Sequence, residues 1–244
     1  MYSPSCYLES DLSELDRLVA GYPFATLITT RDGAPGVTHM PVLYAREGER
    51  IVVRGHWSRA NPQWRDAGDA LLIVHGPHAY VSPSWYPDNF VGNEIGQPQA
   101  GPQGEPHGRG EHKVARVPTW NYATAHIHGK LEVFHDAESL AAIVSELSDR
   151  HEAANGSDWR FEPERADHRV QLKGIVGFRL AASRIELKFK LNQNHPEANR
   201  RAVVAGLTKR GDEQALAVAE LMRARATQAT APEDIVPEEP ATEP

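Results

Sequence analysis

Residues 24–56 read FATLITTRDGAPGVTHMPVLYAREGERIVVRGH, and this stretch decides the fold. It holds three segments rich in β-branched residues, which the short turns Asp32-Gly33 and Glu47-Gly48 separate. Segments of this kind between glycine-containing turns are typical of β-strands joined as hairpins. Such short connections favour an antiparallel sheet, because a parallel pair of strands needs a long crossover. The three predicted strands cover residues 24–30, 37–44 and 50–56.

The flanking sequence extends this pattern and adds helices. The pair Gly76-Pro77 separates two further predicted strands, and a longer strand is expected over residues 122–134. Apolar residues at helical spacing predict a helix that begins after Asp11 and ends at Gly21. We therefore expect an α+β fold with an antiparallel sheet and peripheral helices. The remaining predicted strands cover residues 70–75, 79–82, 170–180 and 184–191, and further helical segments cover residues 58–65, 137–151, 196–209 and 212–225.

Two segments differ in composition from the rest of the chain. Residues 88–113 are rich in glycine and proline and have no hydrophobic periodicity, which predicts a mobile surface loop. Residues 229–244 hold four prolines, five acidic residues and no basic residue, which predicts a disordered acidic tail. We expect one domain over residues 1–228, with the loop inside it.

The bulk composition argues against several classes of protein. The 244 residues carry a formal net charge of −7, so the overall basic charge of a nucleic-acid-binding protein is absent. Any DNA contact is therefore expected to be weak or indirect. Cys6 is the single cysteine, which fits a reducing cytoplasm. The sequence shows no signal peptide and no apolar run long enough for a membrane helix, so we expect a cytoplasmic protein.

One polar segment, His56-Trp-Ser-Arg-Ala-Asn-Pro62, follows the third predicted strand. Ser58 and Arg59 stand where a strand ends and a helical segment begins. A hydroxyl, a guanidinium and free helix-start amides could converge there on one phosphate. The alternative interpretation is an ordinary helix-capping serine beside a surface arginine. The residues alone leave both interpretations open.

A second polar segment, Val117-Pro-Thr-Trp-Asn-Tyr122, leads into the predicted long strand. Trp120 and Tyr122 could wall a planar ring, and Asn121 could bond to the edge of that ring. Aromatic pairs in sheets also commonly serve only for packing. Both interpretations again remain open from the residues alone.

Histidines and lysines supply further candidates. His126 and His128 lie two residues apart on a strand and share one face, where they could ligate a metal or simply pack. Lys188 and Lys190 share a face in the same way, and three amides follow them at residues 192–194. The sequence contains no dinucleotide-binding glycine motif, no Walker motif and no zinc-hydrolase motif.

Four segments, in order, resemble the PaiB-type family of FMN-binding negative transcriptional regulators. The resemblance spans roughly residues 1–225. It implies the split β-barrel fold of the pyridoxamine-phosphate oxidases, FMN as the cofactor, a homodimer and a negative role in transcription. The four segments are RGHWSRANPQW at 54–64, GPHAYVSPSWY at 76–86, VPTWNY at 117–122 and KLNQN at 190–194.

The resemblance also implies roles for single residues. Ser58 and Arg59 match the pair that grips the FMN phosphate, and Thr124 falls near the polar position that contacts the isoalloxazine. Ala60 replaces a lysine and His39 replaces an arginine, so Arg59 is expected to carry most of the anion binding. The full set of cofactor-binding candidates is His39, His56, Ser58, Arg59, Asn61, Trp120, Asn121, Tyr122, Thr124, Lys190, Gln193 and Asn194.

Three functions follow as alternatives, and whether the protein is an enzyme stays open among them. The first is an FMN-binding PaiB-like protein with an indirect negative effect on transcription. The second is a flavin-dependent oxidoreductase that acts on a small substrate. The third resembles the haem-dependent piperazate synthases, which form an N–N bond in N5-hydroxyornithine. Haem b would need an axial ligand, for which His56, His39 and His126 are the candidates.

Overall fold

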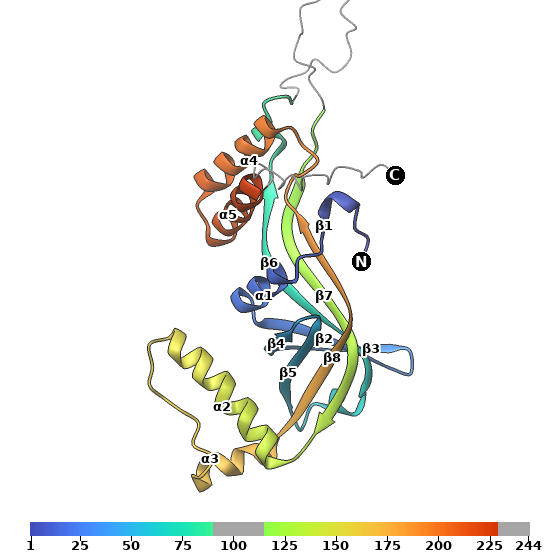
Figure 1. The fold of residues 1–244 in the computed structure, drawn as a ribbon, viewed down its shortest axis with the longest axis vertical. Coiled ribbons are helices and arrows are strands. Elements are labelled where there is room, and N and C mark those ends of the chain that lie inside the picture. Colours follow the sequence, from blue (N-terminus) through green and yellow to red (C-terminus); the bar gives the residue numbers. More distant parts are fainter. Residues whose placement is uncertain (90–114, 229–244) are drawn as a thin grey trace, which may run out of the picture. The chain divides into compact units, whose positions relative to one another are not determined.

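A computed structural model describes residues 1–89 and 115–228, which separate into two compact units (Figure 1). Unit 1 comprises residues 1–76 and 123–190, and unit 2 comprises the described parts of 77–122 and 191–244. The boundaries fall within or at the end of long strands, so no polar linker marks them in the sequence. The predicted single domain stays a prediction beside this division. Apart from residues 88 and 89, the predicted loop 88–113 lies outside the described residues, as does the predicted tail 229–244.

The strands form one antiparallel sheet of eight members. The strand order is β3-β2-β6-β7-β8-β5-β4, and the short β1 pairs with β8 beside this path. The predicted α+β class with an antiparallel sheet is confirmed. The strands are β1 (Leu8–Glu9), β2 (Phe24–Arg31), β3 (Ala34–Pro41), β4 (Leu43–Glu47), β5 (Arg50–Ser58), β6 (Gly68–Val81), β7 (Thr119–Phe134) and β8 (Ile175–Lys190).

A single residue, Val42, joins the two ends of the strand order. β3 and β4 lie at opposite ends of that order, yet only the fully buried Val42 separates them in the chain. The sheet must therefore curl until its ends meet, which makes a barrel. Gly55 of β5 shows how closely β5 approaches β3 where the ends meet. A Cβ at Gly55 would lie 2.7 Å from the ring of Phe178 and 3.4 Å from the backbone oxygen of Pro41 in β3.

The first hairpin has the register that its turn predicts. β2 pairs with β3 from Phe24 opposite Pro41 to Arg31 opposite Ala34. Asp32 and Gly33 between them have φ values of 50° and 80°. Two successive left-handed residues match the twist of an antiparallel hairpin, and aspartate followed by glycine is a favoured pair for this turn.

Two predicted strand breaks are absent from the structure. β6 runs without interruption through Gly76, and β8 begins only at Ile175 and continues through residues 181–183. Gly76 serves close packing and not a turn, because a Cβ there would lie 2.9 Å from the backbone oxygen of Ala123. The predicted strand start at residues 170–174 was wrong, since these residues are helical.

Four of the helices, α1, α2, α4 and α5, lie close to the predicted positions, whereas α3 lies where no helix was predicted. The side chain of Asp11 caps α1 by accepting a hydrogen bond from the amide of Ser13 at 2.8 Å. α2 buries Leu140, Ile143 and Leu147. Within unit 2, α4 and α5 lie side by side (Figure 1). None of the helices in the described ranges is long and apolar enough to span a membrane. The α-helices are α1 (Leu12–Gly21), α2 (Ala137–Ala154), α3 (Ala166–Gln171), α4 (Glu197–Arg210) and α5 (Glu213–Gln228), and the 3-10 helices are η1 (Ser5–Tyr7), η2 (Pro62–Arg65), η3 (Pro83–Trp85) and η4 (Leu172–Gly174).

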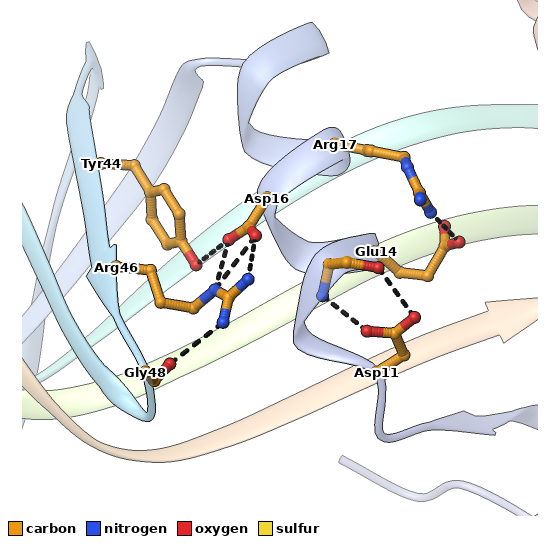
Figure 2. Close-up of polar contacts among 8 residues, drawn as sticks. Asp11, Glu14, Asp16, Arg17, Tyr44, Arg46 and Gly48 are labelled. Carbon is orange, nitrogen blue, oxygen red and sulfur yellow. Dashed lines mark hydrogen bonds and ion pairs between the residues drawn. The ribbon is translucent and has the colours of Figure 1, made fainter.

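A polar cluster fixes α1 to β4, as Figure 2 shows. The Tyr44 hydroxyl donates to Asp16 Oδ1 at 2.8 Å, and Arg46 Nε donates to the same oxygen at 2.9 Å. Arg46 Nη1 also donates to the carbonyl of Gly48 at 3.1 Å. The hydrogen bond from Arg46 lowers the pKa of the Asp16 carboxyl, which is therefore ionised at neutral pH.

Replacing this carboxylate tests its contribution to the fold. Asp16→Asn should lower the free energy of unfolding at pH 7 by about 0.5–1 kcal/mol, because it removes the ion pair with Arg46 and weakens the hydrogen bond from Tyr44. The loss is small because solvent screens the ion pair. The folded pKa of Asp16 lies below its ordinary value of 3.8, so the contribution is complete above that pH and falls as pH drops through the folded pKa. Urea unfolding at several pH values measures both effects.

Glu49→Gln, in the exposed turn between β4 and β5, is the matched control and should leave the free energy of unfolding unchanged. An Asp16→Asn protein as stable as the wild type at pH 7 would show that the cluster contributes nothing.

Candidate functional site

A cavity of about 340 Å³ lies in unit 1 beside the end of β5. Three cationic residues line it, Arg59, Arg169 and Lys173, together with His135. Among the described residues that line the cavity, none is acidic. A hollow with several basic side chains favours an anionic ligand. The other lining residues are Ala137, Leu140 and Leu172.

Arg59 is held in place by the backbone of the segment that precedes β8. Its amide donates to the carbonyl of Gly174 at 2.7 Å. Its guanidinium donates from Nε to the carbonyl of Lys173 at 2.7 Å and from Nη2 to that of Ile175 at 2.9 Å. Nη1 has no partner within residues 1–89 and 115–228. Arg59 is thus positioned for a ligand before any ligand binds, with Nη1 as the donor that points to no described acceptor.

Of the two polar residues beside Arg59, Asn61 caps a helix and Ser58 does not. Asn61 caps η2, because its Oδ1 accepts from the amide of Gln63 at 3.0 Å while its Nδ2 donates to Thr38 Oγ1 at 2.9 Å. Ser58 is the exposed last residue of β5, and its Oγ accepts from the amide of Ala60 at 3.3 Å. The interpretation of Ser58 as the helix cap is therefore wrong.

The two histidines of this region have different surroundings. His39 is exposed on β3, and its Nδ1 lies 2.9 Å from Thr26 Oγ1. His56 is half-buried on β5, and burial lowers its pKa, so the ring is neutral at pH 7. His56 Nδ1 is buried and has no hydrogen-bond partner among the described residues. An uncompensated buried ring nitrogen of this kind is costly and often marks a functional position.

Two further candidates of unit 1 are Thr124 and Lys190. The Thr124 hydroxyl donates to the carbonyl of Val74 at 2.9 Å, across from β7 to β6. Burial, and to a smaller extent the charge of Lys188, lowers the pKa of Lys190. Lys188 itself donates from Nζ to the carbonyl of Tyr2 at 3.0 Å. The shared face that the sequence predicted for the two lysines fits the effect of the Lys188 charge on the pKa of Lys190.

The aromatic segment and the last amides belong to unit 2. The half-exposed Trp120 ring lies 6.1 Å from the ring of His78 and 6.1 Å from that of Tyr80, centre to centre. Asn121 is fully buried, and its Nδ2 donates to Met222 Sδ at 3.4 Å. Its Oδ1 has no partner in the described part of the chain. Tyr122 is half-buried.

Residues 192–194 form a tight turn before α4. Gln193 Oε1 accepts from the amide of Leu191 at 2.7 Å, and Asn194 is exposed. Asn192 has a φ of 61°, and its buried Nδ2 donates to the Tyr86 hydroxyl at 2.6 Å. The run of amides that stood out in the sequence therefore serves in part to hold this turn.

The structure joins some predicted site residues to groups that the sequence did not reveal. Arg169, Lys173 and His135 line the same cavity as Arg59 and were missed. Arg169 and Lys173 are four residues apart, which places them on one side of a helical turn. This signal was hidden because residues 170–180 were assigned to a strand. The sequence-predicted candidates divide between unit 1, with His39, His56, Ser58, Arg59, Asn61, Thr124 and Lys190, and unit 2, with Trp120, Asn121, Tyr122, Gln193 and Asn194.

Comparison with known families assigns the cofactor class. The family model described as a "Putative FMN-binding domain" matches residues 1–92 and 106–184, well over half of the chain. The chain therefore belongs to this family of FMN-binding proteins. The PaiB-type resemblance and FMN as the cofactor are confirmed. The basic cavity beside Arg59 fits the phosphate of FMN, since it offers three cations and no described acidic group.

Three individual proteins illustrate what the chain is similar to. The chain is similar to "Protease synthase and sporulation protein PAI 2" of Bacillus subtilis, with 29% identity over 91% of this chain and 96% of the relative. It is 27% identical to the protein AN0679 of Emericella nidulans, over 92% of this chain and 97% of that one. A solved structure of the FAD and heme binding protein from Mycobacterium smegmatis aligns with a TM-score of 0.49 and 19% identity, over 82% of this chain and 80% of that one.

Two substitutions separate binding from folding at this site. Arg59→Ala removes a charge-assisted contact to phosphate, which typically contributes about 1.5–3 kcal/mol, or roughly 10- to 150-fold in FMN affinity. It also leaves the carbonyls of Lys173 and Ile175 without their donors, so the melting temperature of the FMN-free protein should fall. Lys173→Ala leaves the backbone carbonyl of residue 173 in place as an acceptor for Arg59. It should therefore weaken FMN binding while leaving the melting temperature nearly unchanged.

Flavin fluorescence titration and thermal unfolding measure the two quantities. Lys130→Ala, at an exposed lysine of β7 that pairs with Asp69, is the control and should bind FMN like the wild type. If both Arg59→Ala and Lys173→Ala retain wild-type affinity for FMN, the phosphate does not bind in this cavity.

Proposed function

We propose that this protein is an FMN-dependent regulator of the PaiB type that represses transcription indirectly. The observation that carries the proposal is the cavity beside the end of β5, with Arg59, Arg169 and Lys173 on its walls. These cations would hold the FMN phosphate, the strongest anion of the cofactor. Bound FMN supplies a ring that accepts and donates electrons, so the protein can respond to redox state or to a small redox-active ligand.

The charge distribution supports an indirect route to transcription. The whole chain carries a net charge of −7, and nonspecific DNA affinity depends on cations that neutralise phosphates. The adjacent helices α4 and α5 are the candidate for a DNA-reading pair that the sequence offers, but acidic groups pair with two of their arginines. Arg201 pairs with Glu197 at 2.9 Å, and Arg210 pairs with Asp212 at 2.5 Å. These two ion pairs reduce the number of cations that the helices offer to a DNA backbone.

The name of the Bacillus subtilis relative adds support for a regulatory role. It refers to protease synthesis and sporulation, which are cellular programmes and not single reactions. A cytoplasmic location would suit a regulator of transcription, and the single cysteine, Cys6, fits that compartment.

A haem-dependent enzyme similar to the piperazate synthases is the second candidate. The observation that favours it is His56, whose ring is neutral and whose Nδ1 is buried without a described partner. A neutral imidazole is the form that ligates haem iron. A flavin-dependent oxidoreductase would use the same FMN site as the regulator, and only a substrate would distinguish it.

The absorption spectrum of the purified protein distinguishes the cofactors. We expect the paired visible bands of a flavin and saturable quenching of FMN fluorescence. A protein that takes up haem with a Soret band but does not bind FMN would contradict the proposal and favour the second candidate. In that case, His56→Ala should abolish haem uptake.

We also propose that the protein forms a homodimer through the outer face of the β2–β3 hairpin. Cross-strand partners point to the same side of a sheet, so the pairs Phe24 with Pro41 and Ile28 with Val37 share one face. Phe24 is 62% exposed and Val37 is 51% exposed, which leaves an apolar surface that a second copy could cover.

Light scattering tests the dimer. The wild type should show twice the mass of one chain at micromolar concentration, and Val37→Glu should shift it towards the monomer because a buried charge opposes association. Leu216→Glu, at an exposed apolar residue of α5, is the control and should remain dimeric. A monomeric wild type would overturn the proposal.

A further inference from the structure

Two histidines and one glutamate face one another across neighbouring strands of unit 1. His126 and His128 lie on β7, and Glu186 lies on β8, which is next to β7 in the sheet. Glu186 Oε2 is 3.2 Å from His128 Nε2 and 3.7 Å from His126 Nδ1. The three potential ligand atoms all lie within 4.8 Å of one another. A single carboxylate oxygen thus faces two imidazole nitrogens.

The two oxygens of Glu186 have different neighbours. Oε1 receives the cations, since the Met1 ammonium lies 2.8 Å from it and Arg184 Nη1 lies 2.6 Å from it. Oε2 faces only the two imidazoles among the described groups with polar contacts to Glu186. One carboxylate therefore has a neutralised side and a side that is turned towards two nitrogen ligands.

Without a bound metal ion, the two contacts of His128 Nε2 are incompatible with one another. Arg184 Nη2 lies 2.9 Å from this nitrogen, and Glu186 Oε2 lies 3.2 Å from it. If Nε2 accepts a hydrogen bond from Arg184, it does so with its lone pair and carries no proton. It then has no proton to donate to Glu186 Oε2. An imidazole nitrogen and a carboxylate oxygen that both offer lone pairs at this distance are suited to share a cation.

We propose that His126 Nδ1, His128 Nε2 and Glu186 Oε2 bind a divalent transition metal ion, with zinc as the representative ion. Bonds of 2.0–2.2 Å in tetrahedral geometry place ligand atoms roughly 3.3 Å apart. The separations of 3.2 and 3.7 Å already approach that value. Imidazole and carboxylate are ligands that zinc and its neighbours in the first transition row accept.

The surroundings leave room for further ligands. The side chains of His126, His128 and Glu186 are 22%, 27% and 20% exposed, so an ion can enter and water can complete its coordination. None of the three residues lines the basic cavity beside β5. The site joins β7 to β8, so a bound ion stabilises the folded chain by mass action, independently of FMN.

Calorimetric titration of the untagged, full-length, chelator-treated protein with zinc chloride tests the proposal. We expect one saturable equivalent, a higher melting temperature with zinc, and cobalt absorption bands of a four-coordinate site when cobalt is used instead. His128→Ala and Glu186→Gln should each lower zinc affinity at least roughly tenfold. His78→Ala, at an exposed histidine of β6 outside the cluster, should bind zinc like the wild type.

Arg184→Ala keeps the test decisive if a ligand variant folds poorly. Arg184 is mostly exposed and competes with the ion for His128 Nε2, so its removal should leave zinc affinity unchanged or increase it. The proposal is overturned if the wild type binds no saturable equivalent. It is also overturned if His128→Ala and Glu186→Gln bind zinc as tightly as the wild type, or if Arg184→Ala loses the site.

Discussion

The connection of β3 to β4 through Val42 alone is the constraint on which the rest of unit 1 depends. Because these strands occupy opposite ends of the strand order, the sheet must curl, and Gly55 allows β5 to pass Phe178 and Pro41 closely enough. The end of β5 lies against the start of β8 because these two strands pair directly, with Ser58 opposite Ile175. The carbonyls just before and at that start hold the amide and guanidinium of Arg59. The proposed cofactor site therefore depends on the pairing of β5 with β8, which brings segments far apart in sequence together as its walls.

Much of this fold follows from local sequence signals. The β-branched segments, the Asp32-Gly33 turn and the periodic apolar residues of α2 all specify their own conformation, so the strands and helices were predictable. The errors arose where tertiary packing decides. Gly76 has the composition of a strand break, yet the backbone of Ala123 approaches so closely that only glycine fits in a continuous strand. No local signal distinguishes a glycine required for close packing from one required for a turn.

The candidate site, too, was predictable only where local sequence signals specify it. Arg59 was predictable because a strand end, a hydroxyl and a guanidinium adjoin in sequence, and its family motif agrees. Arg169 and Lys173 were not, because the strand predicted over their segment obscured their shared helical turn. The histidine cluster shows the limit most clearly. The shared face of His126 and His128 follows from a period of two, whereas their partner Glu186 depends on how β7 and β8 align, which pairing across the whole barrel decides.

The central claim is that the cavity beside Arg59 recognises the phosphate of FMN. The most direct measurement compares the dissociation constants of FMN and riboflavin, which differ only by that phosphate, for the wild type and for Lys173→Ala. The wild type should bind FMN at least roughly tenfold more tightly than riboflavin, and this ratio should fall in Lys173→Ala because FMN binding weakens while riboflavin binding does not. Equal affinities of the wild type for the two flavins, or a ratio unchanged by the substitution, would contradict this claim.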